Sequence, residues 1–247
     1  MKSDYKTVVV TGASSGIGAA VAESLSASGL TVHAIARREE RLDELSKKTS
    51  CITHILDVCN TEEFVAFLES IEVDVLVNNA GVGRGYGFLW EALPEDIDKT
   101  IDTNIRASIH AIKGVLPGMI SRQKGHLINI GSMAGLYPLA SSVYGASKGA
   151  MHLLSMDLRL ELQGTGVRVT EICPGRVATE FYQAAVDDLT ILEKVRNSGI
   201  EEVKSEDVAE AVLYAISAPW RVNINRIELQ PTEQTYGGMQ FTPSPLL

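Results

Sequence analysis

Short apolar runs rich in β-branched residues alternate along this chain with longer stretches whose apolar residues recur at helical spacing. Strands are predicted at residues 7–10, 32–36, 52–56, 73–77, 126–130, 167–172 and 226–229. Helices are predicted at residues 16–28, 39–48, 62–70, 94–121, 143–163 and 205–217, with Pro117 expected to kink or end the fourth. Because this alternation is typical of parallel sheets, we expect an α/β fold, a doubly wound parallel sheet of about seven strands with helices on both faces.

Two segments depart from the alternation. Residues 176–204 follow the sixth predicted strand and would overhang the C-terminal edge of the sheet, where folds of this kind bind ligands. The tail at residues 231–247 is polar and rich in Pro and Gly, yet it also carries apolar residues such as Met239 and Phe241. We therefore expect a single domain over residues 1–247, with 176–204 covering a substrate and with a tail apolar enough to pack on a neighbouring subunit.

Composition and charge narrow the possible partners. The chain has 247 residues, 45% of them hydrophobic, which is enough for one sizeable buried core. Its net charge of −9 argues against nucleic acid as a partner, and the absence of a long apolar run argues against a membrane. The cysteines Cys51, Cys59 and Cys173 are odd in number, so we expect a reducing, cytoplasmic location. Neither the cysteines nor the histidines have the spacing of metal ligands, so we expect no metal site.

A glycine-rich loop joins the first predicted strand to the first predicted helix, in the run Thr11-Gly12-Ala13-Ser14-Ser15-Gly16-Ile17-Gly18. Glycines let a backbone approach a pyrophosphate, and a helix N-terminus supplies free N–H groups and partial positive charge. The spacing G-x-x-x-G-x-G departs from the G-x-G-x-x-G fingerprint of many dinucleotide sites. Such a run alone is often a plain tight turn, but its position after the first strand favours a nucleotide site.

A tyrosine and a lysine, Tyr144 and Lys148, stand four residues apart in a predicted helix and therefore share one of its faces. A phenol with a pKa near 10 is a poor acid or base at neutral pH, and a fixed ammonium beside it favours the phenolate and lowers that pKa. The pair alone is weak evidence, because this spacing arises often by chance on exposed helices. The pair becomes evidence for a catalytic site because a nucleotide-type loop lies upstream in the same chain.

Together these motifs resemble those of the short-chain dehydrogenases/reductases, whose loop reads TGxxxGxG, and the resemblance covers nearly the whole chain. It implies a Rossmann-like fold and hydride transfer between a nicotinamide and a carbonyl carbon. Tyr144 would exchange the proton, Lys148 would lower the tyrosine pKa and bind the nicotinamide ribose, and Ser132 would stabilise the substrate oxygen. Asn104 would disturb its helix and hold a water on a relay to Lys148. Taken singly, Ser132 could be a strand-end turn and Asn104 a helix-surface amide.

The resemblance also implies the cofactor contacts, in loops that close successive strands. Asp57 would accept a hydrogen bond from the adenine amino group, Asn79 and Gly81 would flank the adenosine ribose, and Val177 and Thr179 would touch the carboxamide. The full set is Gly12, Ser14, Ser15, Gly16, Ile17, Gly18, Arg37, Arg38, Asp57, Val58, Asn79, Gly81, Tyr144, Lys148, Pro174, Gly175, Val177 and Thr179. The plainer alternatives are an Asx cap at Asp57 and an ordinary turn at residues 78–81.

The end of the second predicted strand decides between the two nicotinamide dinucleotides. An NAD enzyme usually has a carboxylate there for the ribose 2′-OH, whereas this chain has Ala36-Arg37-Arg38. Two guanidiniums are suited to a 2′-phosphate, and Ser14 and Ser15 could add hydroxyl donors. The alternative is two solvated charges at the start of a helix. We predict NADP(H).

Local runs at residues 128–132, 166–170 and 222–232 resemble one branch of the family, the NADP-dependent 3-hydroxy acid and serine dehydrogenases, with sulfoacetaldehyde reductases and clavulanate-type dehydrogenases nearby. The resemblance implies a carbonyl reductase or alcohol dehydrogenase for a small polar, usually anionic substrate. A buried anion needs a cation or several donors. The candidates are Arg196 first, then Lys194, Arg84 and Gln240, so the predicted substrate-binding residues are Ser132, Tyr144 and Arg196.

Two other functions stay open at this point. One is a reductase of a bulkier ketone, such as a secondary-metabolite intermediate, which an apolar pocket of Tyr86, Phe88, Trp90, Tyr137 and Phe181 would support. The other is a non-catalytic NADP-binding protein. Because family members are commonly tetramers through their long helices, here residues 94–121 and 143–163, we also expect a homo-oligomer, either a tetramer or a dimer.

Overall fold

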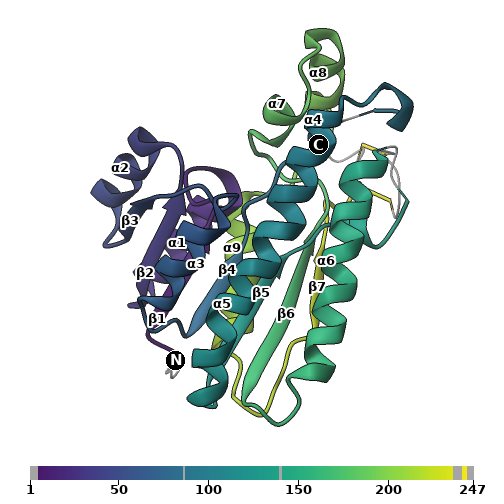
Figure 1. Ribbon diagram of the computed structural model, residues 1–247. Coiled ribbons are helices and arrows are strands. Elements are labelled where there is room, and N and C mark those ends of the chain that lie inside the picture. Colours follow the sequence, from purple (N-terminus) through teal and green to yellow (C-terminus); the bar gives the residue numbers. More distant parts are fainter. Residues whose placement is uncertain (1–4, 86, 139–140, 236–240, 244–247) are drawn as a thin grey trace.

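The computed structural model describes residues 5–85, 87–138, 141–235 and 241–243. In these residues seven parallel strands form one sheet in the order β3-β2-β1-β4-β5-β6-β7 (Figure 1). The strands are β1 (Thr7–Thr11), β2 (Thr31–Ala36), β3 (Ile52–Ile55), β4 (Val75–Asn78), β5 (Gly125–Ile130), β6 (Val167–Pro174) and β7 (Arg226–Leu229). The predicted doubly wound α/β fold is confirmed. The strand order reverses between β1 and β4, and ligands bind at the carboxyl ends of the strands beside such a reversal.

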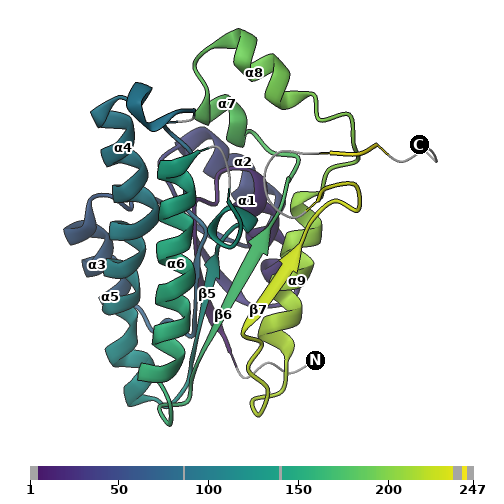
Figure 2. The same ribbon diagram turned by 90° about the vertical axis from the view of Figure 1, so that its right-hand side faces the viewer.

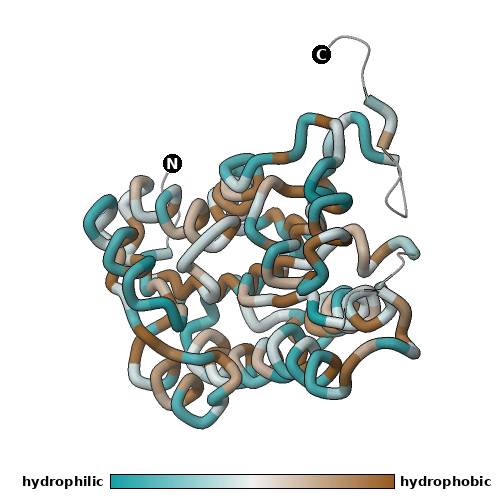
Figure 3. The backbone as a smooth tube through the Cα atoms, turned by 90° about the horizontal axis from the view of Figure 1, so that it is seen from above, coloured by the Kyte–Doolittle hydropathy of each residue, from teal (hydrophilic) through white to brown (hydrophobic). Residues whose placement is uncertain are grey.

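Helices cover both faces of the sheet (Figure 2). They are α1 (Gly16–Ala27), α2 (Glu39–Lys48), α3 (Thr61–Glu69), α4 (Pro94–Ile101), α5 (Ala107–Ser121), α6 (Ser142–Glu161), α7 (Phe181–Ala185), α8 (Leu189–Arg196) and α9 (Ser205–Ser217). Alternate residues of β1 serve the two faces, because Val8 and Val10 belong to the core beneath α1 and α9, whereas Val9 belongs to the core beneath α3 and α5. Burial on both faces explains why the central strands β1 and β4 are continuous apolar runs. Seen from above, hydrophobic positions gather in the middle and hydrophilic ones on the outer helices (Figure 3).

The predicted helix at 94–121 consists of three parts. A wider π-helical turn, Asp102–Arg106, lies between α4 and α5, at the position expected for the Asn104 disturbance. Pro117 lies inside α5 but does not end it, since the helix continues to Ser121. Within the described parts of the chain, no helix has both the length and the apolar character needed to cross a bilayer.

The segment 176–204 projects beyond the C-terminal edge of the sheet and holds the short helices α7 and α8 (Figure 1). At its base, Val177 pairs in parallel with Val203, so the two ends of the segment meet. The beginning of the tail turns back toward the same edge, and the side chain of Gln234 there accepts a hydrogen bond of 2.8 Å from the Arg176 backbone N–H.

Candidate active site

A cavity of about 460 Å³ follows the C-terminal edge of the sheet, beside the reversal of strand order. It is lined by nearly all the predicted cofactor residues: Gly12, Ser14, Ser15, Gly16, Ile17, Arg37, Arg38, Asp57, Val58, Asn79, Gly81, Pro174, Gly175, Val177 and Thr179. Ser132, Tyr144 and Lys148 line the same cavity. Three predicted residues do not line it, namely Gly18, Asn104 and Arg196. The fold thus brings a nucleotide-type loop and a tyrosine–lysine–serine group to one site.

The glycine loop has its shape because side chains would not fit. Gly12 and Gly16 have φ angles of +69° and +53°, in the left-handed region that favours glycine. Gly18 lies behind the loop, where a Cβ would come within 2.3 Å of the Gly12 carbonyl oxygen. Its role is to let α1 approach the loop, so that the N-terminus of α1 faces the cavity. An anionic diphosphate fits this arrangement.

Asn79 ties the end of β4 to the glycine loop. Its amide donates to the Thr11 carbonyl at 2.9 Å, and the Thr11 hydroxyl accepts from the backbone N–H groups of Asn79 and Ala80, each at 3.0 Å. Gly81 follows, and a Cβ there would come within 3.6 Å of Lys148 Nζ. The loop after β4 is therefore fixed between the nucleotide loop and the lysine.

Three arginines, not two, gather at the end of β2. Arg38 donates from Nε to the Ser14 hydroxyl at 3.1 Å and from Nη2 to the Ser15 hydroxyl at 2.5 Å. Its Nη1 pairs with Glu180 at 3.2 Å, and Arg41 pairs with the same carboxylate at 3.2 Å. Sequence reasoning missed Arg41, although it stands one helical turn after Arg37 and Arg38 in α2.

Arg37 forms a longer pair of 3.5 Å with Asp57. Asp57 also accepts from the Cys59 backbone N–H at 2.9 Å, so the Asx-type contact considered as the plain alternative is present. It coexists with a place in the cavity wall. The cations and hydroxyls of this region suit a 2′-phosphate, and the glycine loop suits a pyrophosphate, so the residues fit NADP.

Ser132 and Tyr144 meet at the other end of the cavity. Ser132 begins the short turn after β5, where its hydroxyl accepts from the Ala134 backbone N–H at 3.1 Å, and it is near enough to the Tyr144 phenol to stabilise the phenolate by donating a hydrogen bond, which lowers the tyrosine pKa. Lys148 Nζ lies 5.9 Å from the centre of the Tyr144 ring and donates to the Ile130 carbonyl at 2.8 Å. Phe181, from α7, packs on Tyr144 with ring centroids 5.2 Å apart.

Burial is the main influence on the pKa values of Tyr144 and Lys148. Burial raises the pKa of Tyr144 to about 12, and the hydrogen bond from Ser132 offsets this only in part. Burial also lowers the pKa of Lys148 to about 8. Burial is the largest influence on the tyrosine pKa, and the Lys148 ammonium is directed to the Ile130 carbonyl; its expected effect of lowering that pKa remains a prediction. Tyr144 is therefore protonated at neutral pH.

Asn104 is buried in the π-helical turn and does not reach the cavity wall. Its Oδ1 accepts from the Val82 N–H at 2.8 Å, and its Nδ2 donates to the Val82 carbonyl and the Ser147 hydroxyl, each at 2.9 Å. Asn104 thus joins the loop after β4 to the helix of Tyr144. Its water-holding role remains a prediction.

The structure places the candidate substrate cations elsewhere than expected. Arg196 lines a second cavity, between the 176–204 segment and helices α1 and α2, and not the one that holds Tyr144. Arg84 forms ion pairs with Asp96 at 2.7 Å and Asp187 at 2.6 Å, so it fastens the segment to the loop after β4. Gln240 lies outside the described residues, as does Tyr86. Besides Arg37 and Arg38, the Tyr144 cavity is lined by Arg176, to which sequence reasoning had not assigned a role, and Arg176 also lines the second cavity.

The remaining wall of the cavity is mixed. Tyr137 and Phe181 contribute apolar surface, and so does Tyr182, which was not predicted. Phe88 and Trp90 stack on each other at 4.5 Å outside the cavity, so the apolar pocket proposed for a bulkier ketone is incomplete. Gln234 and Thr235 of the tail also line the cavity, so the tail reaches the pocket of its own chain.

Comparison with known proteins shows the family of the chain. The family model for short chain dehydrogenases matches residues 6–190. An NADP-dependent 3-hydroxy acid dehydrogenase of Escherichia coli is 41% identical over 243 residues, covering 94% of this chain and 97% of the relative. An uncharacterised short-chain type dehydrogenase/reductase of Sinorhizobium fredii is 39% identical over 239 residues, covering 96% of each.

Among solved structures, the closed form of a serine dehydrogenase complexed with NADP+ is 39% identical and superimposes with a TM-score of 0.89, covering 96% of this chain and 100% of that one. The chain belongs to the short-chain dehydrogenase family. The resemblance inferred from the glycine loop and the tyrosine–lysine pair is confirmed, and with it the prediction of an oxidoreductase.

Proposed function

We propose that this NADP-dependent oxidoreductase interconverts a small, polar, anionic aldehyde or ketone with its alcohol, of the 3-hydroxy acid, serine or sulfoacetaldehyde/isethionate type. NADP dependence agrees with the three arginines at β2 and with the NADP-dependent and NADP+-complexed relatives. The observation that carries the proposal is that one cavity holds both the phosphate-type loop and the Ser132–Tyr144 pair. A non-catalytic binding protein would not need this pair.

The geometry supports a simple division of labour in the reduction. When bound, NADPH supplies the hydride to the carbonyl carbon. The Ser132 hydroxyl donates to the carbonyl oxygen, and Tyr144, protonated because of its raised pKa, gives the oxygen a proton as negative charge develops there. Lys148 then stabilises the resulting phenolate electrostatically, and Asn104 keeps the surrounding loops in register.

The covering segment and the partners are part of the proposal. Residues 176–204 would close over the substrate, since Phe181 and Tyr182 from α7 already line the cavity. We further propose a cytoplasmic homo-oligomer built through α5 and α6, because Ile109, Leu153 and Leu160 on these helices are exposed. Size-exclusion chromatography with light scattering tests the assembly, and a monomer at micromolar concentration would contradict it.

The direct test of the activity is NADPH oxidation with a panel of carbonyl compounds. Malonic semialdehyde, sulfoacetaldehyde and succinic semialdehyde represent small anions, and simple ketones represent neutral substrates. We expect turnover of at least one small anion with a higher kcat/KM than any neutral ketone. Turnover of bulky neutral ketones alone would contradict the substrate class while leaving the oxidoreductase intact.

A further inference from the structure

Arg176 lies at the base of the covering segment, two residues after the end of β6. Its side chain keeps only 2% of its surface exposed, although it carries a full charge. A buried guanidinium is stable only where acceptors surround it, so each of its N–H groups needs a partner.

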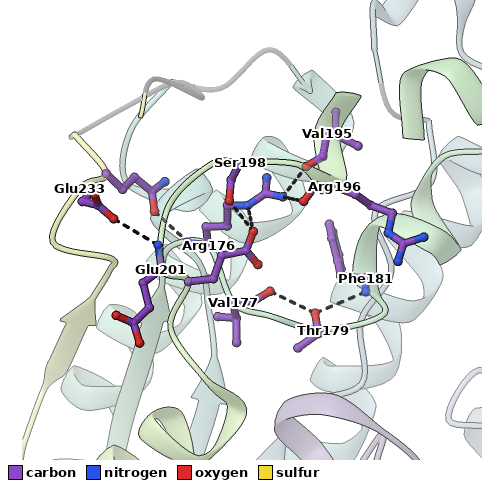
Figure 4. A network of polar contacts seen from close by, with 11 residues as sticks. Arg176, Val177, Thr179, Phe181, Val195, Arg196, Ser198, Glu201 and Glu233 are labelled. Atoms are coloured by element: carbon purple, nitrogen blue, oxygen red, sulfur yellow. Dashed lines mark hydrogen bonds and ion pairs between the residues drawn. The ribbon is translucent and has the colours of Figure 1, made fainter. Parts of the chain in front are cut away.

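One edge of this guanidinium is fixed by the covering segment (Figure 4). Nε pairs with the Glu202 carboxylate, and Nη2 donates to the carbonyls of Val195 and Arg196, the latter at 3.2 Å. Both carbonyls lie at the end of α8, where a cation is favoured by the helix dipole. The guanidinium carbon also lies 4.7 Å from the centre of the Tyr182 ring and 5.4 Å from that of Phe241 in the tail.

The other edge is unsatisfied. Nη1 is buried and has no hydrogen-bond partner among the described residues, which normally costs free energy. Arg176 lines the same cavity as Tyr144 and Ser132, and it also lines the second cavity beside it. Tyr182, on which it stacks, lines both cavities too, and electrostatic repulsion from its phenol adds to the effect of burial in raising the pKa of Tyr144. The unpaired N–H groups therefore belong to a residue that reaches the reaction site.

We propose that Nη1 of Arg176 binds the anionic group of the substrate, a carboxylate or a sulfonate, while Ser132 and Tyr144 hold the reacting oxygen. This assignment rests on the proposed function. Because Nη1 is shielded from solvent, an anion there pairs with it in a medium of low dielectric, where the attraction is strong. Glu202 and the end of α8 hold the guanidinium in place, so little side-chain freedom is lost on binding.

The test compares each anion with a neutral molecule of nearly the same shape. With NADP+, kcat/KM is measured for 3-hydroxypropanoate against 3-hydroxypropanamide, and for isethionate against 2-(methylsulfonyl)ethanol. Arg176→Gln is expected to lower the anion-to-neutral ratio about 10- to 100-fold, the loss typical of a charged hydrogen bond, and Arg176→Lys is expected to recover part of it. The pair that loses its ratio identifies carboxylate or sulfonate as the ligand. If Arg176 only held the segment in place, both members of each pair would slow equally, and an unchanged ratio would overturn the inference.

Two matched variants separate the roles. Arg196→Gln removes an arginine that lines only the second cavity, and this variant is expected to keep the anion-to-neutral ratio of kcat/KM. Glu202→Gln removes the ion pair but leaves Nη1, so the ratio is expected to stay or rise, and a fall equal to that of Arg176→Gln would count against an anion at Nη1. A wild-type enzyme with no preference for anions would refute the proposed substrate class itself. A preference that survives Arg176→Gln would refute only the role of Arg176.

Discussion

At the scale of single residues, the proposed mechanism depends on one phenol, that of Tyr144, held protonated beside the Ser132 hydroxyl. Tyr144→Phe removes the proton donor but keeps the ring that packs on Phe181. We expect kcat for carbonyl reduction to fall about 100- to 10,000-fold, the usual contribution of a positioned general acid. NADPH affinity, measured by fluorescence titration, should remain within about twofold, because the phosphate-type loop is untouched. Near-normal turnover would remove the phenol from the mechanism.

Lys148 sets the pH range in which that phenol can work. Burial lowers its pKa to about 8, whereas Tyr144, with a pKa raised to about 12, stays protonated far above neutrality. As pH rises through about 8, Lys148 loses the charge that stabilises the forming phenolate, so the rate of NADPH-dependent reduction should fall.

Lys148→Arg provides the check, because a guanidinium stays charged throughout this range. The pH–rate profile of that variant should be lower in amplitude but free of the fall near pH 8. The same inflection in both proteins would assign the titration to another group.

At the scale of elements, the approach of α1 to the glycine loop has no room for a side chain. Gly18→Ala would put a Cβ within 2.3 Å of the Gly12 carbonyl oxygen, so the loop or the helix must move. We expect the KM for NADPH to rise at least about tenfold, as misplacement of a binding group by about 1 Å commonly costs more than that. Gly118→Ala is the control, since its Cβ would come near the end of the Arg122 side chain, at 3.0 Å from Nη1, and not near backbone. Equal effects of the two variants would mean that the approach of α1 is not the cause.

The elements also show what the sequence can and cannot predict. The central strands β1 and β4 were predictable because both of their faces are buried, which leaves continuous apolar runs. The π-helical turn could be expected only from the family resemblance and not from the local sequence pattern. Asn104 is held there by Val82 and Ser147, which are distant from it in the sequence. Likewise, the choice between Arg176 and Arg196 depends on how the covering segment folds back: the Arg196 carbonyl accepts from Arg176, and of the two residues Arg176 alone lines the Tyr144 cavity. Local pattern carries no signal for such tertiary contacts.

At the scale of the whole molecule, the covering segment is fastened at both ends of the cavity. Arg84 and Asp187 hold it near the loop after β4, and Arg176 holds it over the sheet edge. At the cofactor end, Glu180 pairs with Arg38 and Arg41, the same cations that suit the 2′-phosphate. Glu180 immediately precedes Phe181, which packs on Tyr144. We infer from these adjacent residues that cofactor binding is connected to the proposed closure over the substrate.

This connection gives a prediction for Glu180→Gln. A 2′-phosphate must share Arg38 and Arg41 with the carboxylate or displace it, and either costs free energy because like charges meet. Removing the charge should lower the KM for NADPH about two- to fivefold, because exposed ion pairs contribute at most about 1 kcal/mol. The KM for NADH, which has no 2′-phosphate, should stay unchanged. Glu44→Gln, on the same helix as Arg41, is the control for net charge alone. If both variants tighten NADPH equally, general electrostatics explains the effect. If Glu180→Gln instead weakens NADPH, the carboxylate positions the arginines rather than competing for them.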